Sequence, residues 1–148
     1  MADFLHVVCP HCDTVNRVPE LRLDDRPTCG QCKKELFMGQ PLELSGKSFP
    51  QHISRNDIPV LVDFWAPWCG PCQGMAPGYA RAAAQLEPRM RVAKLNTEDA
   101  RELAAGYAIR SIPTLALFRR GREVARQAGA MDAAGILAWA RAHAEASA

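Results

Sequence analysis

Residues 60–72 decide the fold, and they read Val-Leu-Val-Asp-Phe-Trp-Ala-Pro-Trp-Cys-Gly-Pro-Cys. The first six form a nearly continuous apolar run of strand length, which is typical of a strand buried on both faces. The last four are Cys69-Gly70-Pro71-Cys72, and they follow a short turn. Because proline is well tolerated in the first turn of a helix, this stretch predicts a strand that leads directly into a helix.

The segments after this junction alternate between helix and strand patterns. The expected elements are a helix over 72–86, a strand over 92–96, a short helix over 99–105, hairpin strands over 114–118 and 123–127, and a last helix from Asp132 to His143. The Asp132 carboxylate is a suitable N-cap for that helix. Elements in this order predict an α/β fold, with a mixed central sheet flanked by helices.

The position of Cys69 at the start of a helix favours a reactive thiol. The free N–H groups and the positive dipole end of a helix N-terminus stabilise a thiolate and lower its pKa toward neutrality. A thiolate attacks disulfides, and Cys72 is close enough in sequence to close a disulfide with it. Asp63 is a carboxylate within an apolar strand, so we expect a raised pKa and proton exchange near neutral pH.

Residues 64–72 match the active-site signature of the thioredoxin family almost residue for residue. The chain resembles that family over residues 41–148, with further matching segments at 75–77, 92–96, 109–114 and 129–130. The resemblance implies a thioredoxin fold and the activity of a protein-disulfide reductase, a thiol-disulfide oxidoreductase. One departure is Gln73, where many relatives have Lys or Arg, and another is Gly74.

The resemblance also implies roles for individual residues. Cys69 would be the nucleophile and Cys72 the resolving thiol. Asp63 would be the base for the resolving thiol with Lys94 as its charge partner, and Pro113 would be a cis-proline facing the disulfide. The implied substrate-binding surface comprises Trp68, Gly70, Pro71, Ile112, Pro113, Gly129 and Ala130. Three plainer alternatives stay open: a merely ion-paired Asp63, a solvated Lys94 and an ordinary trans Pro113.

Two further Cys-x-x-Cys pairs lie near the N-terminus, at Cys9/Cys12 and Cys29/Cys32, with 16 residues between them. Two short knuckles at this spacing match the pattern of a structural zinc site. A region of about forty residues cannot bury a large hydrophobic core, so a bound metal would supply stability that the core lacks. We therefore expect one structural zinc in a ribbon-like domain over 1–40, followed by a thioredoxin domain over 41–148. The whole chain then resembles a branch of the thioredoxin family that carries an N-terminal zinc ribbon.

Other interpretations of these four cysteines remain possible at this point. They could form a second redox disulfide system, or His6 or His11 could replace one thiolate at the metal. The ribbon could also be a binding adaptor, or a redox switch that releases zinc on oxidation.

Composition narrows the remaining function classes. The chain has 148 residues and a net charge of +2, which argues against a dedicated binder of nucleic acid. It has no run of 18 apolar residues and no basic segment before an apolar run at the start, so we expect a cytoplasmic protein without a membrane partner. No Gly-x-Gly-x-x-Gly motif follows a strand, so no bound flavin or nicotinamide is expected. The resemblance implies disulfide-containing proteins and an NADPH-linked thioredoxin reductase as partners, and we expect a monomer.

Overall fold

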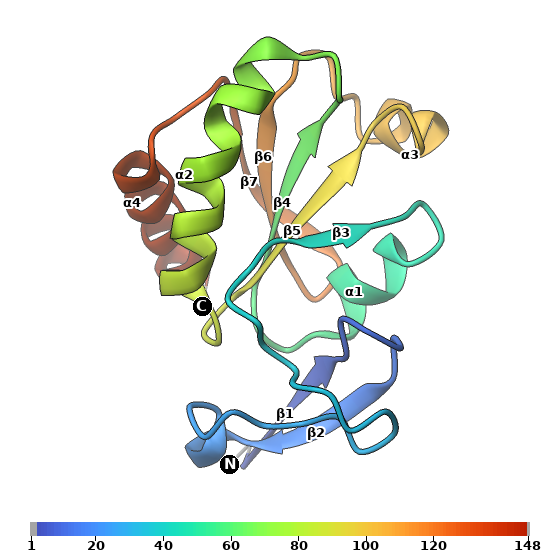
Figure 1. Cartoon of the computed structure of the whole chain (residues 1–148), viewed down its shortest axis with the longest axis vertical. Coiled ribbons are helices and arrows are strands. Elements are labelled where there is room, and N and C mark those ends of the chain that lie inside the picture. The colour runs from blue at the N-terminus through green and yellow to red at the C-terminus, as the bar shows by residue number, and fades with distance from the viewer. Residues whose placement is uncertain (1–2, 148) are drawn as a thin grey trace.

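The computed structural model describes residues 3–147, which form a small N-terminal unit and a larger unit built on a five-stranded sheet (Figure 1). The N-terminal unit contains the antiparallel strands β1 (Phe4–Val8) and β2 (Val15–Pro19), followed by a 3₁₀ turn at Glu20–Arg22. Its buried core comprises Val7, Cys9, Val18, Leu23, Cys29 and Leu36. Two of these six residues are cysteines, so apolar packing alone contributes little to this unit.

The larger unit contains a mixed sheet with strand order β3-β5-β4-β6-β7. The strands are β3 (Leu42–Leu44), β4 (Val60–Trp65), β5 (Arg91–Asn96), β6 (Thr114–Arg119) and β7 (Arg122–Ala128). The first three in spatial order are parallel, whereas β6 runs antiparallel to both β4 and β7. The central strand β4 is buried along its length except at Trp65, which explains its nearly continuous apolar sequence.

Helices cover both faces of this sheet (Figure 1). On one face lie α2 (Gly70–Leu86) and α4 (Ala133–Ala146), and on the other lie α1 (Phe49–Arg55) and α3 (Arg101–Gly106). Alternate residues of β4 point into two separate cores, which contain Leu61 with Tyr79 on one side and Val62 with Phe49 on the other. The predicted α/β fold with a mixed sheet flanked by helices is therefore confirmed.

Two elements of the larger unit, β3 and α1, were not anticipated from the sequence. Strand β3 has only three residues and is exposed at Glu43, so it is too short to show a pattern of alternation. Helix α1 has seven residues and begins beside Pro50 without a side-chain cap, so the usual start signal is missing.

The last helix is longer than the sequence analysis expected. It begins as predicted, with the Asp132 carboxylate accepting a hydrogen bond from Gly135 N–H at 2.8 Å. It ends at Ala146, whereas His143 was the expected end. Alanine has the highest helix propensity, and the Arg119 guanidinium donates to the carbonyl of Ala144 at 3.2 Å, so the last turn stays helical.

A buried arginine joins the N-terminal unit to the sheet. Arg91, the first residue of β5, is 1% exposed and donates hydrogen bonds to the carbonyls of Val8 (3.1 Å) and Leu36 (2.8 Å). The same guanidinium pairs with Glu87 at 3.1 Å and lies over the ring of Phe37. The sequence analysis missed this residue, because its partners come from 55 and 83 positions earlier in the chain.

Two more buried polar side chains complete the junction between the units. The side-chain Oδ1 atom of Asn56 accepts a hydrogen bond from Val8 N–H at 2.8 Å. His52, 1% exposed, has its Nε2 atom 2.8 Å from the Asp13 carboxylate. These contacts lie at the end of the sheet where β4 and β5 begin, so β4, about 20 Å long, separates them from the β4–α2 junction (Figure 1). Within residues 3–147, no helix is both long and apolar enough to cross a membrane.

Candidate functional site

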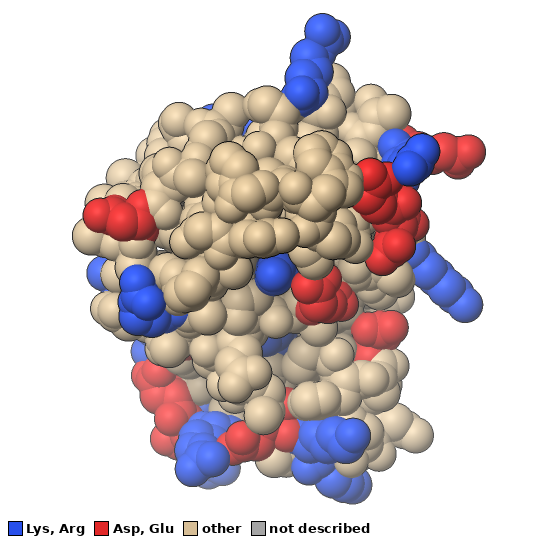
Figure 2. All heavy atoms as spheres, turned by 45° about the horizontal axis from the view of Figure 1, so that its top comes forward, with Lys and Arg blue, Asp and Glu red and all other residues tan. Residues whose placement is uncertain are grey.

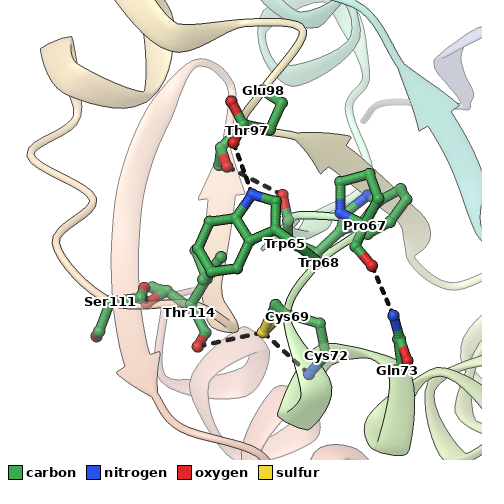
Figure 3. Close-up of a disulfide and its surroundings, with 11 residues drawn as sticks. Trp65, Pro67, Trp68, Cys69, Cys72, Gln73, Thr97, Glu98, Ser111 and Thr114 are labelled. Carbon is green, nitrogen blue, oxygen red and sulfur yellow. Dashed lines mark hydrogen bonds between the residues drawn. A yellow bond between two sulfur atoms is a disulfide. The ribbon is translucent and has the colours of Figure 1, made fainter.

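Cys69 and Cys72 form a disulfide at the junction of β4 and α2, with their Cα atoms 5.3 Å apart. Cys69 is the N-cap of α2, and the N–H of Cys72 donates to Cys69 Sγ at 3.2 Å (Figure 3). Both cysteines are buried and pack with Ala66, Trp65 and Ile112. A helix N-terminus thus points its free N–H groups at Cys69, which is the arrangement that favours a thiolate after reduction.

The loop before β6 contacts this disulfide, and the residue after β7 contacts that loop. The carbonyl oxygen of Ile112 lies 3.7 Å from Cys69 Sγ, and the peptide bond between Ile112 and Pro113 is cis. Gly129, with a φ of +98°, donates its N–H to the carbonyl of Pro113 at 2.9 Å. A residue with a side chain would be strained at this φ, so glycine suits the backbone conformation at this position.

Trp68 is the most prominent side chain beside the disulfide. It is 68% exposed, and its indole N–H donates to Glu98 Oε1 at 2.6 Å (Figure 3). Arg101 pairs with the same carboxylate at 2.6 Å. The hydrogen bonds from Trp68 and Arg101 hold the pKa of Glu98 below its usual value. Glu98 was not predicted from the sequence. Its position two residues after β5 is the one feature that could have indicated it, because β5 and β4 end at the same end of the sheet as the disulfide.

The residues expected to bind substrate surround the disulfide, although they differ in exposure. Trp68, Gly70, Pro71, Gly129 and Ala130 are exposed, Ile112 is half-buried and Pro113 is buried. Figure 2 shows that the end of the molecule where α2 begins presents a broad face with few charges, and charged side chains gather at its margin. At Gln73, the departure from the family pattern, the side-chain amide donates to the Pro67 carbonyl at 2.6 Å and adds no charge to this face.

Asp63 lies on β4, two residues before Trp65, and is 1% exposed. Its Oδ1 atom is buried and has no hydrogen-bond partner in the described part of the chain. Burial raises the pKa of Asp63 to about 7, while the charge of Lys94 lowers it and the charge of Glu43 raises it. A carboxyl group with this pKa can hold or release a proton near neutral pH.

Lys94 lies directly opposite Asp63 in the register of β4 and β5. Its Nζ atom is 3.7 Å from Glu43 Oε1 and 4.3 Å from the centroid of the Trp65 ring, and its side chain is 19% exposed. Lys94 is therefore not a solvated surface lysine. Its ion pair is with Glu43, and it acts on Asp63 through charge alone.

The four N-terminal cysteines converge in one cluster, with all four Sγ atoms within 4.8 Å of one another. Between the two knuckles, the Sγ atoms of Cys9 and Cys32 are 3.6 Å apart, and those of Cys12 and Cys29 are also 3.6 Å apart. Tetrahedral zinc at its usual distance from sulfur requires about 3.8 Å between ligand atoms, so the cluster fits this metal. Backbone N–H groups of His11 and Gln31 donate to Cys9 and Cys29, which favours thiolates.

The two histidines considered as alternative ligands have other partners. His11 Nε2 lies 3.0 Å from the carbonyl oxygen of Glu35, and His6 Nδ1 lies 2.9 Å from the Asp57 carboxylate. The cluster found among residues 3–147 consists of the four cysteines. This donor set is typical of a four-cysteine metal site.

Comparison with known proteins matches one family model to each of the two units. The family model described as Thioredoxin matches residues 40–142, and the zinc-ribbon model described as Thioredoxin 2, N-terminal, matches residues 8–34. Thioredoxin C-3 of Corynebacterium nephridii is 45% identical over 133 residues, covering 90% of this chain and 91% of that protein. The thioredoxin of Porphyra purpurea is 47% identical over 89 residues, covering 60% of this chain and 83% of that protein. The structure of a mutant thioredoxin from Halobacterium salinarum NRC-1 aligns with a TM-score of 0.65 and 32% identity, covering 73% of this chain and 94% of that one.

Proposed function

Because this chain belongs to the thioredoxin family of thiol-disulfide oxidoreductases, we propose that it reduces protein disulfides through Cys69 and Cys72. The observation that carries the proposal is the hydrogen bond from Cys72 N–H to Cys69 Sγ at the start of α2. The N–H group and the helix dipole stabilise a thiolate at Cys69, and the thiolate is the attacking species in thiol–disulfide exchange.

The proposed reaction has two exchange steps. The Cys69 thiolate attacks one sulfur of the substrate disulfide, a mixed disulfide forms, and the other substrate sulfur leaves as a thiolate that takes up a proton. Cys72 then loses its proton and attacks Cys69 Sγ, which closes the Cys69–Cys72 disulfide and releases the second substrate thiolate. The protein thus gives two electrons to the substrate. Cys72 supplies one of the two protons that the substrate thiolates take up, through its base, and water supplies the other.

We assign the proton of the second step to Asp63. Its carboxyl group is buried, and its pKa of about 7 lets the ionised form accept a proton from Cys72 near neutral pH. Lys94 is its charged neighbour on β5, and its attraction opposes the effect of burial. Asp63 and Lys94 therefore act on the resolving step rather than on the first attack.

We propose that substrates bind across the uncharged face around the disulfide. The residues would be Trp68, Gly70, Pro71, Ile112, Pro113, Gly129 and Ala130, which lie on the α2 start and the two loops opposite. An extended substrate segment can pair with the backbone of such loops. The membership in the family supports a thioredoxin reductase as the electron donor, with NADPH as the ultimate source.

We propose that Cys9, Cys12, Cys29 and Cys32 hold one zinc ion with a structural role. When bound, zinc supplies the cross-link that holds the two knuckles together. The position of the cluster at the far end of β4 from the disulfide supports a structural role over a catalytic one. Four thiolate ligands must stay reduced, which supports the cytoplasm as the compartment.

Variants of the two cysteines test this function. Cys69→Ser should abolish the reduction of insulin by NADPH and thioredoxin reductase, because it removes the nucleophile. Cys72→Ser should trap a mixed disulfide with the substrate, visible as a mass increase that a reducing agent reverses. Cys12→Ser, the control, removes a thiol from the metal cluster and should keep most of the turnover. Turnover by Cys69→Ser at the wild-type rate would refute the proposal.

A further inference from the structure

Three charged residues form a row across the sheet. Glu43 on β3 lies directly opposite Lys94 on β5, and Lys94 lies directly opposite Asp63 on β4. Residues paired in a parallel sheet point to the same face, so the three side chains share the face covered by α2. The row therefore runs from the exposed edge of the sheet at β3 to its buried centre at β4.

Exposure falls steadily along this row. The side chain of Glu43 is 56% exposed, that of Lys94 is 19% exposed, and Asp63 is 1% exposed. Lys94 can reach either carboxylate in principle, because it stands between them. Its Nζ atom makes its ion pair with Glu43 at 3.7 Å, and the ion pairs within residues 3–147 do not include Asp63.

The other groups packed against Asp63 bring no charge that competes with this row. From α2, Tyr79 is fully buried and donates its hydroxyl to the Ala93 carbonyl at 2.6 Å, and burial raises its pKa well above its usual value. On β6, Leu115 lies opposite Asp63 in the register. Cys69 and Cys72, at the start of α2, are joined in the disulfide. Lys94 and Glu43 are thus the charges that act on Asp63.

We propose that Glu43 is a positioning residue that draws the Lys94 ammonium toward the sheet edge, so that Asp63 can carry a proton during the resolving step. This inference rests on the role of Asp63 proposed above. Glu43 acts in two ways that add together. Its negative charge disfavours a second negative charge at Asp63, and its ion pair withdraws the positive charge that would favour one. The Trp65 ring, 4.3 Å from Nζ, supports the lysine stem in this position.

The titration of the Asp63 carboxyl group, followed by carbon NMR on the full-length oxidised protein, tests the inference. Glu43→Gln should move the midpoint to lower pH, because repulsion is lost and Lys94 is released toward Asp63. Lys94→Met should move it to higher pH. In the Lys94→Met background, Glu43→Gln should have a smaller effect, since only the direct repulsion remains. The shift caused by Glu43→Gln should also shrink at high salt, because Glu43 is exposed.

Glu102→Gln is the matched control, since it removes one exposed carboxylate from α3 of the same unit. An unchanged Asp63 midpoint in Glu43→Gln, or an equal shift in Glu102→Gln, would overturn the inference. The decay of a preformed mixed disulfide gives a second readout, and its pH profile should move to lower pH in Glu43→Gln. If Asp63→Asn leaves that profile unchanged, the proposed base is wrong, and this result is distinct from a failed shift in the Glu43 variant.

Discussion

The two kinds of Cys-x-x-Cys pair are locally alike and differ in what lies across from them. In the metal cluster, the N–H of His11 donates to Cys9 Sγ at 3.3 Å, and in the disulfide site the N–H of Cys72 donates to Cys69 Sγ at 3.2 Å. Cys9 Sγ lies 3.6 Å from Cys32 Sγ of the other knuckle, whereas Cys69 Sγ is bonded to Cys72 of its own motif. The short motif therefore directs a backbone N–H at its first sulfur in both places, and the opposing element distinguishes the proposed metal site from the disulfide.

The two units also differ in what stabilises them. The N-terminal unit has one core of six residues, while the sheet of the larger unit has a core on each face. We therefore expect the proposed metal cross-link to matter for the stability of the first unit and not for that of the second. A change made in one unit, with stability or metal affinity measured in both, tests this difference.

The largest expected effect is that of removing the metal. Structural zinc contributes about 10–16 kcal/mol in zinc-finger peptides near neutral pH, far more than a core of this size supplies. Chelation should unfold the N-terminal unit, so the amides of β1 and β2 should lose protection from hydrogen exchange. The amides of β4 should stay protected, and insulin reduction should continue. Loss of protection along β4 would contradict the distinction between the two units.

The second prediction concerns Arg91, which joins the units. Arg91→Ala should destabilise the protein by about 3–5 kcal/mol, because it leaves Glu87 as a buried, unpaired charge. It also removes the donors to Val8 and Leu36, so protection of β1 should fall as well. Urea unfolding with hydrogen exchange measures both effects.

Arg89→Ala is the matched control for Arg91. Arg89 pairs with Asp24 between the same two units, but both side chains are 62% exposed. The loss of an exposed pair costs about 0–1 kcal/mol. Equal losses in the two arginine variants would mean that burial does not distinguish these two contacts.

The third prediction concerns Asp63. Its pKa rises from 3.8 to about 7 on folding, so the native protein binds a proton more tightly than the unfolded chain between these values. Stability should therefore fall as the pH rises from 3.8 to about 7. Asp63→Asn removes this penalty and should stabilise the protein by roughly 4 kcal/mol above the native pKa, with no gain below the unfolded pKa.

Denaturant midpoints across this pH range test the sign of the Asp63 effect. Zinc affinity should not change in Asp63→Asn, because Asp63 lies in the larger unit. The resolving step should slow in the same variant, because its proposed base is lost. A stabilisation that does not depend on pH would contradict the assignment of a raised pKa to this carboxyl group.

Features set by a short stretch of sequence could be predicted, whereas features that depend on contacts between distant residues could not. Residues 60–72 contain their own strand, turn and helix start, so the junction follows from the sequence alone. The two cysteine knuckles are equally local. In the sequence, Arg91 is indistinguishable from an exposed charged residue before a strand. It can be buried because the carbonyls of Val8 and Leu36, far away in the chain, accept its hydrogen bonds. The Trp68–Glu98 contact likewise depends on two chain segments that meet only in the folded sheet.

The smallest expected effect tests whether the two units unfold together. Asp132→Ala removes the cap of α4 and leaves Gly135 N–H without its acceptor, which should cost about 1 kcal/mol. Helix α4 packs on α2 and Ile136 lies in the core beside Leu61, so the whole cost should appear in the unfolding of the larger unit. Zinc affinity, measured by competition with a chelator, should stay at the wild-type value, because the metal can leave through opening of the N-terminal unit alone. If zinc affinity falls in step with the denaturant midpoint, Arg91 and its neighbours couple the two units into one cooperative structure.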